Sequence, residues 1–247
     1  MNNALDEQLG AFLTTTKIPG SLLYAKVWGS HSHNTAMPNS DMDFGAVYRL
    51  PTRRILGLDP GAETTEGKAP DFQAHELAKF ARLLLKGNPA ILEMLFTERG
   101  QYMTFPWLAL RAERRRFLSR RVVQQYVGYA RGQLHKLKHK AYLHTSGGRY
   151  NTKWAYHLVR LLRDGIRIAE GREPKVWKDG AERETLMGIR RGEMSEGDAV
   201  TLASQLLNEA ETALAKSTLP ANGDAAWLEK WMVCLRLIDL QSEEQDD

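Results

Sequence analysis

Cysteine is nearly absent from this chain of 247 residues, because Cys234 is the only one. A single thiol excludes a disulfide framework and a cysteine-based zinc site within one chain. Long apolar runs are also missing, and none approaches the ~20 residues that a membrane helix needs. Residues 1–13 contain acidic groups and no basic segment before an apolar core, so they do not resemble a secretory signal. We therefore expect a cytoplasmic protein that does not insert into a membrane.

Neither sign of charge is in large excess, since the net charge is only +4. The basic residues are nevertheless concentrated between residues 111 and 140, where Glu113 is the only acid. The basic residues there are Arg111, Arg114, Arg115, Arg116, Arg120, Arg121, Arg131, Lys136, Lys138 and Lys140. Tyr126, Tyr129 and Tyr142 are interleaved with them. This run indicates either a solvated helix face or a track for the phosphate backbone of RNA or DNA, with the tyrosines as stacking partners.

The composition, with 43% apolar and 26% charged residues, is typical of a globular protein with a sizeable core. Apolar spacing predicts strands over 21–28 and 42–50 and a brief strand at 71–74, with a polar loop at 59–70. Helical spacing is found over 3–14, over 75–86 and again after Pro89. From about residue 105 helices dominate, over roughly 106–117, 119–145, 151–171, 196–216 and 224–240. We predict an α+β protein, with a mixed-sheet lobe over 1–100, a helical lobe over 101–247 and a cleft between them.

The stretch most relevant to chemistry is GSHSHNTAMPNSDMDFG, residues 29–45. Gly29 and Ser30 follow an apolar strand, so they offer a close backbone approach, N–H donors and a hydroxyl to a triphosphate. Asp41 and Asp43 are one residue apart, and alternate side chains of a strand point the same way. Such a pair suits Mg²⁺ or Mn²⁺ together with substrate phosphates. Asp71, which opens the next predicted strand, is the best candidate for a third carboxylate. An isolated Asp-x-Asp is more often a solvated strand edge or a turn, and the order, spacing and strand context of these motifs are what favour a metal site.

This order of motifs resembles the polymerase-beta-like nucleotidyltransferase superfamily. The sequence of residues 29–58 is similar to one branch of it, the predicted nucleotidyltransferases of bacteria and phages, which include those called RNA-ligase-associated. Three later segments are similar to that branch too: HELAKFARLLLKGNPAILEMLF, NTKWAYHLVRLL and LMGIRRGEMS. The resemblance therefore covers about residues 18–200. It implies that Gly29 and Ser30 hold the β,γ-phosphates, that Asp41 and Asp43 bind the metals and that Asp71 completes the set. Relatives usually carry Gly where this chain has Asn34. After Gly, Asn is the residue that best tolerates a left-handed backbone conformation, so we expect the turn to be kept.

Two further groups of polar residues need an interpretation. Lys153, His157 and Arg160 recur at helical spacing and share one face, which predicts a cationic surface for nucleotide phosphates; routine exposed charges are the alternative. His31 and His33 are read as solvent-exposed loop histidines rather than as metal ligands.

We therefore expect a metal-dependent nucleotidyltransferase that moves a nucleoside monophosphate from a nucleoside triphosphate to an acceptor hydroxyl and releases pyrophosphate. The favoured acceptor is an RNA end, such as that of a tRNA, because of the basic helical run. Three alternatives stay open: transfer to a protein hydroxyl, as in some toxin–antitoxin relatives; transfer to a small alcohol; and a catalytically silent module that binds nucleic acid or a partner.

Overall fold

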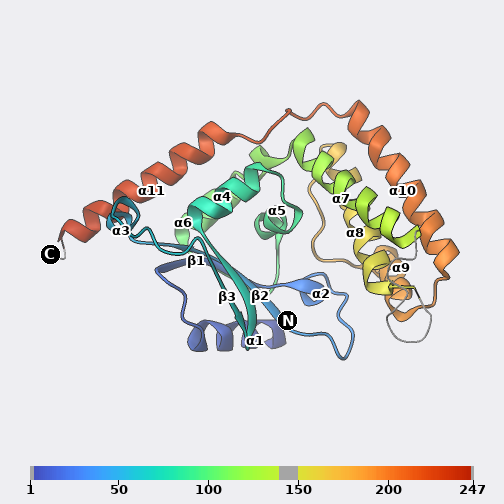
Figure 1. The fold of residues 1–247 in the computed structure, drawn as a ribbon, viewed down its shortest axis with the longest axis horizontal. Coiled ribbons are helices and arrows are strands. Elements are labelled where there is room, and N and C mark those ends of the chain that lie inside the picture. The colour runs from blue at the N-terminus through green and yellow to red at the C-terminus, as the bar shows by residue number, and fades with distance from the viewer. Residues whose placement is uncertain (1–2, 139–149, 246–247) are drawn as a thin grey trace. The chain divides into compact units, whose positions relative to one another are not determined.

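The computed structural model describes residues 3–138 and 150–245, and Figure 1 shows their arrangement. A five-stranded mixed sheet has the strand order β3-β4-β2-β1-β5. Its strands are β1 (Ser21–Val27), β2 (Asp43–Arg49), β3 (Thr64–Lys68), β4 (Asp71–Glu76) and β5 (Gln101–Met103). β2 and β4 are parallel, and the other neighbouring strands are antiparallel.

Most of the remaining described chain is helical. The helices are α1 (Asn3–Thr15), α2 (Gly29–Ser32), α3 (Thr52–Leu56), α4 (Leu77–Leu85), α5 (Pro89–Phe96), α6 (Phe105–Ala112), η1 (Arg114–Phe117), α7 (Arg120–Lys138), α8 (Thr152–Ala169), α9 (Gly180–Arg191), α10 (Glu196–Lys216) and α11 (Ala225–Gln245). The predicted α+β class, with a mixed sheet followed by helices, is confirmed.

Two compact units make up the chain. Unit 1 consists of residues 1–86, 91–114 and 224–247 and contains the sheet. Unit 2 consists of residues 87–90 and 115–223 and is helical where it is described. The last helix thus belongs to the unit that contains the sheet, whereas the boundary at residue 100 stays a prediction.

One face of the sheet in unit 1 packs on α1, as Figure 1 shows. Phe12 of α1 stacks on Phe44 of β2, with ring centroids 4.5 Å apart, and meets Phe72 of β4 edge-on at 5.6 Å. Stacked and edge-on rings at these separations stabilise a core beyond the area that they bury. This apolar face fixes the orientation of β2 and β4, so that alternate residues of both strands point to the opposite face.

The opposite face of the sheet lies against α4 and α6. Tyr24 of β1 stacks on Trp107 of α6 at 4.1 Å, and Phe80 of α4 contacts the same indole at 5.1 Å. Burial raises the pKa of Tyr24 far above its usual value, so its hydroxyl stays protonated and donates to Gln101 Oε1 at 3.2 Å. The sheet is therefore covered on both faces.

Three elements are not predicted by the sequence pattern. β3 lies at an edge of the sheet and is half-buried or exposed throughout, so its residues lack the apolar alternation of a strand. β5 is an edge strand of three residues. α9 is bounded by Asp179 and by Gly192 in a left-handed conformation, within a segment for which the sequence analysis predicts no element. Backbone pairing with β4 and β1, rather than side-chain burial, makes β3 and β5 strands.

Unit 2 is built around the contacts that α8 makes with α7, α9 and α10. Inside it, Lys178 Nζ donates to both carboxylate oxygens of Asp164, at 2.9 and 2.8 Å. Arg167 joins Asp164 to Glu182. A buried charge costs little only when it is paired and hydrogen-bonded, and this network meets that condition.

Part of the predicted helix 119–145 lies outside the described residues, as do Lys140 and Tyr142; the described part is helical from Arg120 to Lys138. Over the described ranges, every helix is too short or too polar to cross a bilayer.

Candidate active site

The candidate site begins where β1 ends in unit 1. Trp28 N donates to Asp43 O at 2.7 Å, which ties the end of β1 to the start of β2. Gly29 then takes a positive φ of 64°, a backbone conformation that glycine adopts without a steric penalty. α2 follows for a single turn, so Gly29 and Ser30 lie at the tip of a strand as the sequence predicts.

The turn after α2 is closed by its own hydrogen bonds. Thr35 N and Oγ1 donate to Ser30 O at 3.0 and 3.3 Å, and Ser32 Oγ donates to Gly29 O at 2.8 Å. Asn34 has a φ of 57°, so it takes the left-handed conformation expected of a residue in place of glycine. The backbone around Ser30 is therefore held in one geometry by local contacts.

The three predicted carboxylates differ in their placement. Asp43 and Asp71 open the parallel strands β2 and β4 and are direct partners in the register. Neighbouring strands lie ~4.8 Å apart, and partners in the register share a face. Asp41 is exposed and precedes β2, so strand alternation does not settle its direction. The structure thus brings Asp43 and Asp71 together, whereas the roles of all three carboxylates stay predictions.

Asp43 also lies against the glycine turn. A Cβ at position 29 would lie 2.8 Å from Asp43 Oδ2, which is closer than real Cβ atoms approach. Glycine at this position leaves room for the carboxylate beside the backbone, in addition to satisfying the positive φ. The result is a carboxylate adjacent to the turn that is predicted to hold phosphate.

The prediction that His33 is exposed is wrong. His33 is 4% exposed, and its Nε2 lies 3.6 Å from Oε2 of Glu93, which is 2% exposed on α5. A histidine in a loop that folds back onto a helix becomes part of the core, and loop position alone does not reveal this. His31 is half-buried, with Nε2 3.2 Å from Ser40 O.

A buried lysine near the end of β1 is absent from the sequence-based predictions. Lys26, the last residue but one of β1, is fully buried and donates to Thr97 Oγ1 at 2.7 Å. Thr97 Oγ1 in turn donates to Glu93 O at 2.8 Å. The signal is present in the sequence, because a lysine inside the apolar run SLLYAKVW is unusual unless its ammonium group is paired.

The three basic residues predicted to bind nucleotide all lie on α8 in unit 2. Lys153 is exposed, whereas Arg160 is only 4% exposed, and its Nη2 lies 3.3 Å from His157 Nδ1. His157 contacts Tyr129 edge-on at 5.5 Å. Burial of Arg160 leaves Lys153 as the exposed cation of the three, and their nucleotide-binding role stays a prediction.

The donors at the site fit a hard divalent cation. Within residues 3–138 and 150–245, the protein assembles no group of three or more His, Cys, Asp or Glu that could hold a metal by itself. Mg²⁺ is usually held by one or two carboxylates together with substrate phosphates, so a pair of aspartates beside a turn that is predicted to hold phosphate is sufficient. Asp43, kept beside the turn by the missing Cβ of Gly29, is the residue that best meets this description.

A comparison with protein families identifies the family of this chain. Residues 1–232 match the model of RlaP, described as the RNA repair pathway DNA polymerase beta family. The chain belongs to this family. RlaP is a polymerase-beta-like nucleotidyltransferase family, so the resemblance seen in the sequence is confirmed, and nucleotidyltransferases of this kind generally use divalent metals.

One curated relative comes from a phage. The chain is 30% identical over 123 residues to a protein of Enterobacteria phage T4, described as an uncharacterized 38.9 kDa protein in the nrdC-mobD intergenic region. The match covers 44% of this chain and 36% of the relative. The chain therefore spans about a third of the relative's length.

Proposed function

We propose that this protein is a metal-dependent nucleotidyltransferase that moves a nucleoside monophosphate from a nucleoside triphosphate to the hydroxyl of an RNA end. The observation that carries the proposal is the pairing of Asp43 with Asp71 in the register of β2 and β4, directly beside the Gly29 turn. Membership of the RlaP family supports the reaction type.

In the proposed reaction the acceptor oxygen forms a bond to the α-phosphorus, and the bond from that phosphorus to the β-bridging oxygen breaks. The proton of the acceptor hydroxyl passes to Asp71, and pyrophosphate leaves. The backbone N–H groups at Gly29 and Ser30 hold the β,γ-phosphates, so the leaving group is oriented before transfer. Lys153, which is exposed on α8, stays predicted to contact nucleotide phosphates.

Asp41 and Asp43 would hold Mg²⁺ or Mn²⁺, together with Asp71. When bound, the ions neutralise charge on the phosphates and polarise the α-phosphate. The contribution of the chain itself is to hold Asp43 at the start of the paired strand β2, where the bond from Trp28 N to Asp43 O fixes its backbone.

RNA is the acceptor that the observations favour. The family description places its members in an RNA repair pathway. In this chain, α7 carries five Arg or Lys residues and no Asp or Glu over Arg120–Lys138. Transfer to a protein hydroxyl or to a small alcohol is a different outcome of the same test, because each gives a product of different mass.

The test is release of pyrophosphate from each nucleoside triphosphate, with Mg²⁺ and total RNA, by the wild type and by Asp43→Asn. We expect the variant to lose at least ~100-fold in rate, because replacing even an outer partner of a bound metal costs ~10–100-fold. The urea midpoint should stay near that of the wild type.

Asp6→Asn is the matched control, because Asp6 is exposed on α1 and the same change of charge should leave the rate unaltered. An Asp43→Asn protein that releases pyrophosphate at the wild-type rate would contradict the proposal. A wild type that binds RNA but releases no pyrophosphate with any nucleotide would favour the silent binding module instead.

A further inference from the structure

α7 in unit 2 has one apolar and one polar face. Its buried stripe, which packs on α8 and α10, consists of Val122, Val123, Tyr126, Val127, Ala130, Leu134 and Leu137. The opposite face is exposed and carries Arg120, Arg121, Arg131, Lys136 and Lys138. Arg131 pairs with Glu211 of α10 at 2.6 Å, so its charge is partly balanced. Because the helix has no carboxylate of its own, this face is suited to a polyanion.

Aromatic rings border this face on the side of α8. Tyr129 is 46% exposed, and its ring is held edge-on against His157 at 5.5 Å. Lys136 Nζ lies 5.4 Å from the centre of the Trp154 ring, which places a cation beside a second aromatic group. An exposed ring that is held by a neighbour offers a preformed surface for stacking.

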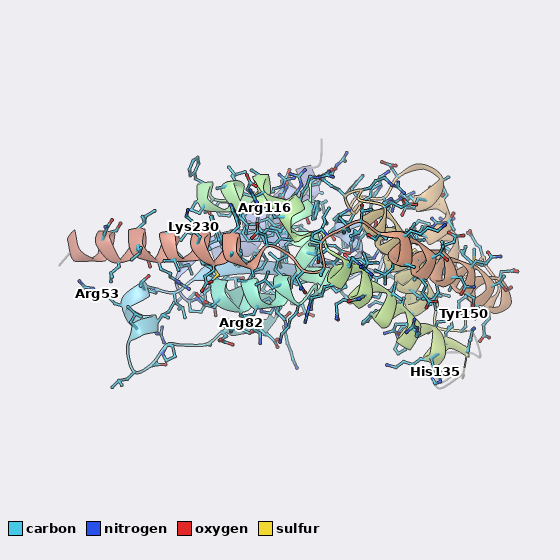
Figure 2. All side chains as sticks on the ribbon, turned by 90° about the horizontal axis from the view of Figure 1, so that it is seen from above. Arg53, Arg82, Arg116, His135, Tyr150 and Lys230 are labelled. Carbon is cyan, nitrogen blue, oxygen red and sulfur yellow. The ribbon has the colours of Figure 1, made fainter. Side chains whose placement is uncertain are left out.

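The middle of the exposed face has no side chains that project from the helix, because two glycines lie there one turn apart. At Gly128 and Gly132, a Cβ would meet no heavy atom within 4 Å. Each helical glycine costs about 0.5–1 kcal/mol of stability relative to alanine, so folding gains nothing from them. Open space above both residues lets a ligand backbone approach the helix between Arg121 and Lys136. His135, labelled in Figure 2, lies near the C-terminal end of the same helix and is exposed.

We propose that this α7–α8 face, defined by Arg121, Gly128, Tyr129, Gly132 and Lys136, binds single-stranded RNA. The sugar–phosphate backbone lies over the two glycines, the cations contact its phosphates, and one base stacks on Tyr129. A single strand is favoured over a duplex because only an unpaired base can be splayed onto an exposed ring. The inference rests on the proposed function, since the RNA bound here is the acceptor of the nucleotide.

The test is direct binding of a fluorescein-labelled 12-nucleotide RNA, followed by anisotropy in EDTA and without nucleoside triphosphate. Tyr129→Ala is expected to raise Kd by about 5-fold to 150-fold, which is the range for loss of one stacking contact between a base and an aromatic ring. Tyr102→Ala is the matched control, because Tyr102 is also exposed, at 42%, but lies in unit 1. Arg121→Gln combined with Lys136→Gln should lower the salt slope by about 0.7 for each phosphate that is no longer neutralised.

Gly128→Leu separates binding from folding. Leucine is the better helix former, so this variant should unfold at a higher urea concentration and yet bind the RNA more weakly. A wild-type Kd for Tyr129→Ala, tighter binding of a duplex of the same length, or unchanged binding by Gly128→Leu would overturn the inference.

Because binding is measured without metal or nucleotide, failure of this inference is distinguishable from failure of the proposed reaction. A protein that releases pyrophosphate while Tyr129→Ala keeps full affinity refutes the α7–α8 face alone. A protein that binds RNA through this face but releases no pyrophosphate refutes the reaction alone.

Discussion

At position 29 the backbone has a φ of 64°, and the absent Cβ leaves room for the carboxylate of Asp43. Gly29→Ala introduces a methyl group 2.8 Å from Asp43 Oδ2, so the carboxylate must move. We expect pyrophosphate release to fall by at least ~100-fold, because displacement of ~1 Å at a reacting centre has an effect of that size. The left-handed conformation should also cost about 1–2 kcal/mol of unfolding free energy.

Gly10→Ala is the control for this change. Gly10 lies in α1, and a Cβ there would meet nothing within 4 Å. The same substitution should raise the free energy of unfolding by about 0.5–1 kcal/mol and leave the rate unchanged. If Gly29→Ala retained full activity, the proposed contact between the turn and Asp43 would be unnecessary for catalysis.

His75 gives a pH-dependent prediction. It is buried on β4 beside Thr64 Oγ1, 3.2 Å from Nδ1, and burial together with the charge of Lys79 lowers the pKa of His75 below its usual value. In the unfolded chain the pKa of a histidine is ~6.5, so below this pH the unfolded chain binds a proton more readily than the folded protein does. The free energy of unfolding should therefore decrease as pH falls through ~6.5, by at most ~1.4 kcal/mol per unit from this residue.

Urea unfolding of the wild type and of His75→Gln between pH 8 and pH 5 checks this sign. The His75→Gln curve should fall less steeply on acidification than the wild-type curve. Parallel curves for the wild type and His75→Gln would contradict the assignment.

Among the elements, α11 shows how a distant segment completes the unit that contains the sheet. Arg236 donates to Leu50 O at 2.7 Å and pairs with buried Glu76, which itself caps the start of α4. Asp239 accepts from Thr52 N and Oγ1, both at 3.0 Å. These bonds connect α11 to the end of β2, to α3 and to the start of α4.

Arg236→Ala should lower the free energy of unfolding by about 2–4 kcal/mol, because it leaves a buried carboxylate and a carbonyl without this donor. Lys230→Ala, an exposed change on the same helix (Figure 2), should stay within about 0.5 kcal/mol. Equal urea midpoints for the two variants would show that α11 contributes little to unit 1.

For the whole molecule, the sequence predicted what depends on local pattern. The strands around residues 29–45 and the left-handed turn at Asn34 follow from apolar runs and from residue type. The contact of His33 with Glu93 and the direct pairing of Asp43 with Asp71 depend on segments far apart in the chain. Local spacing carries no information on such pairs, and the polar edge strand β3 escapes prediction for the same reason.

The central claim is nucleotide transfer to RNA, and one labelling experiment tests it most directly. Purified protein is incubated with Mg²⁺, each α-³²P nucleoside triphosphate, total cellular RNA and protein extract, in parallel with Asp43→Asn. We predict label in a discrete RNA band from one nucleotide, absent with the variant. Label in a protein band would contradict the RNA acceptor, and label that persists with Asp43→Asn, or that never appears, would contradict the proposed catalytic site.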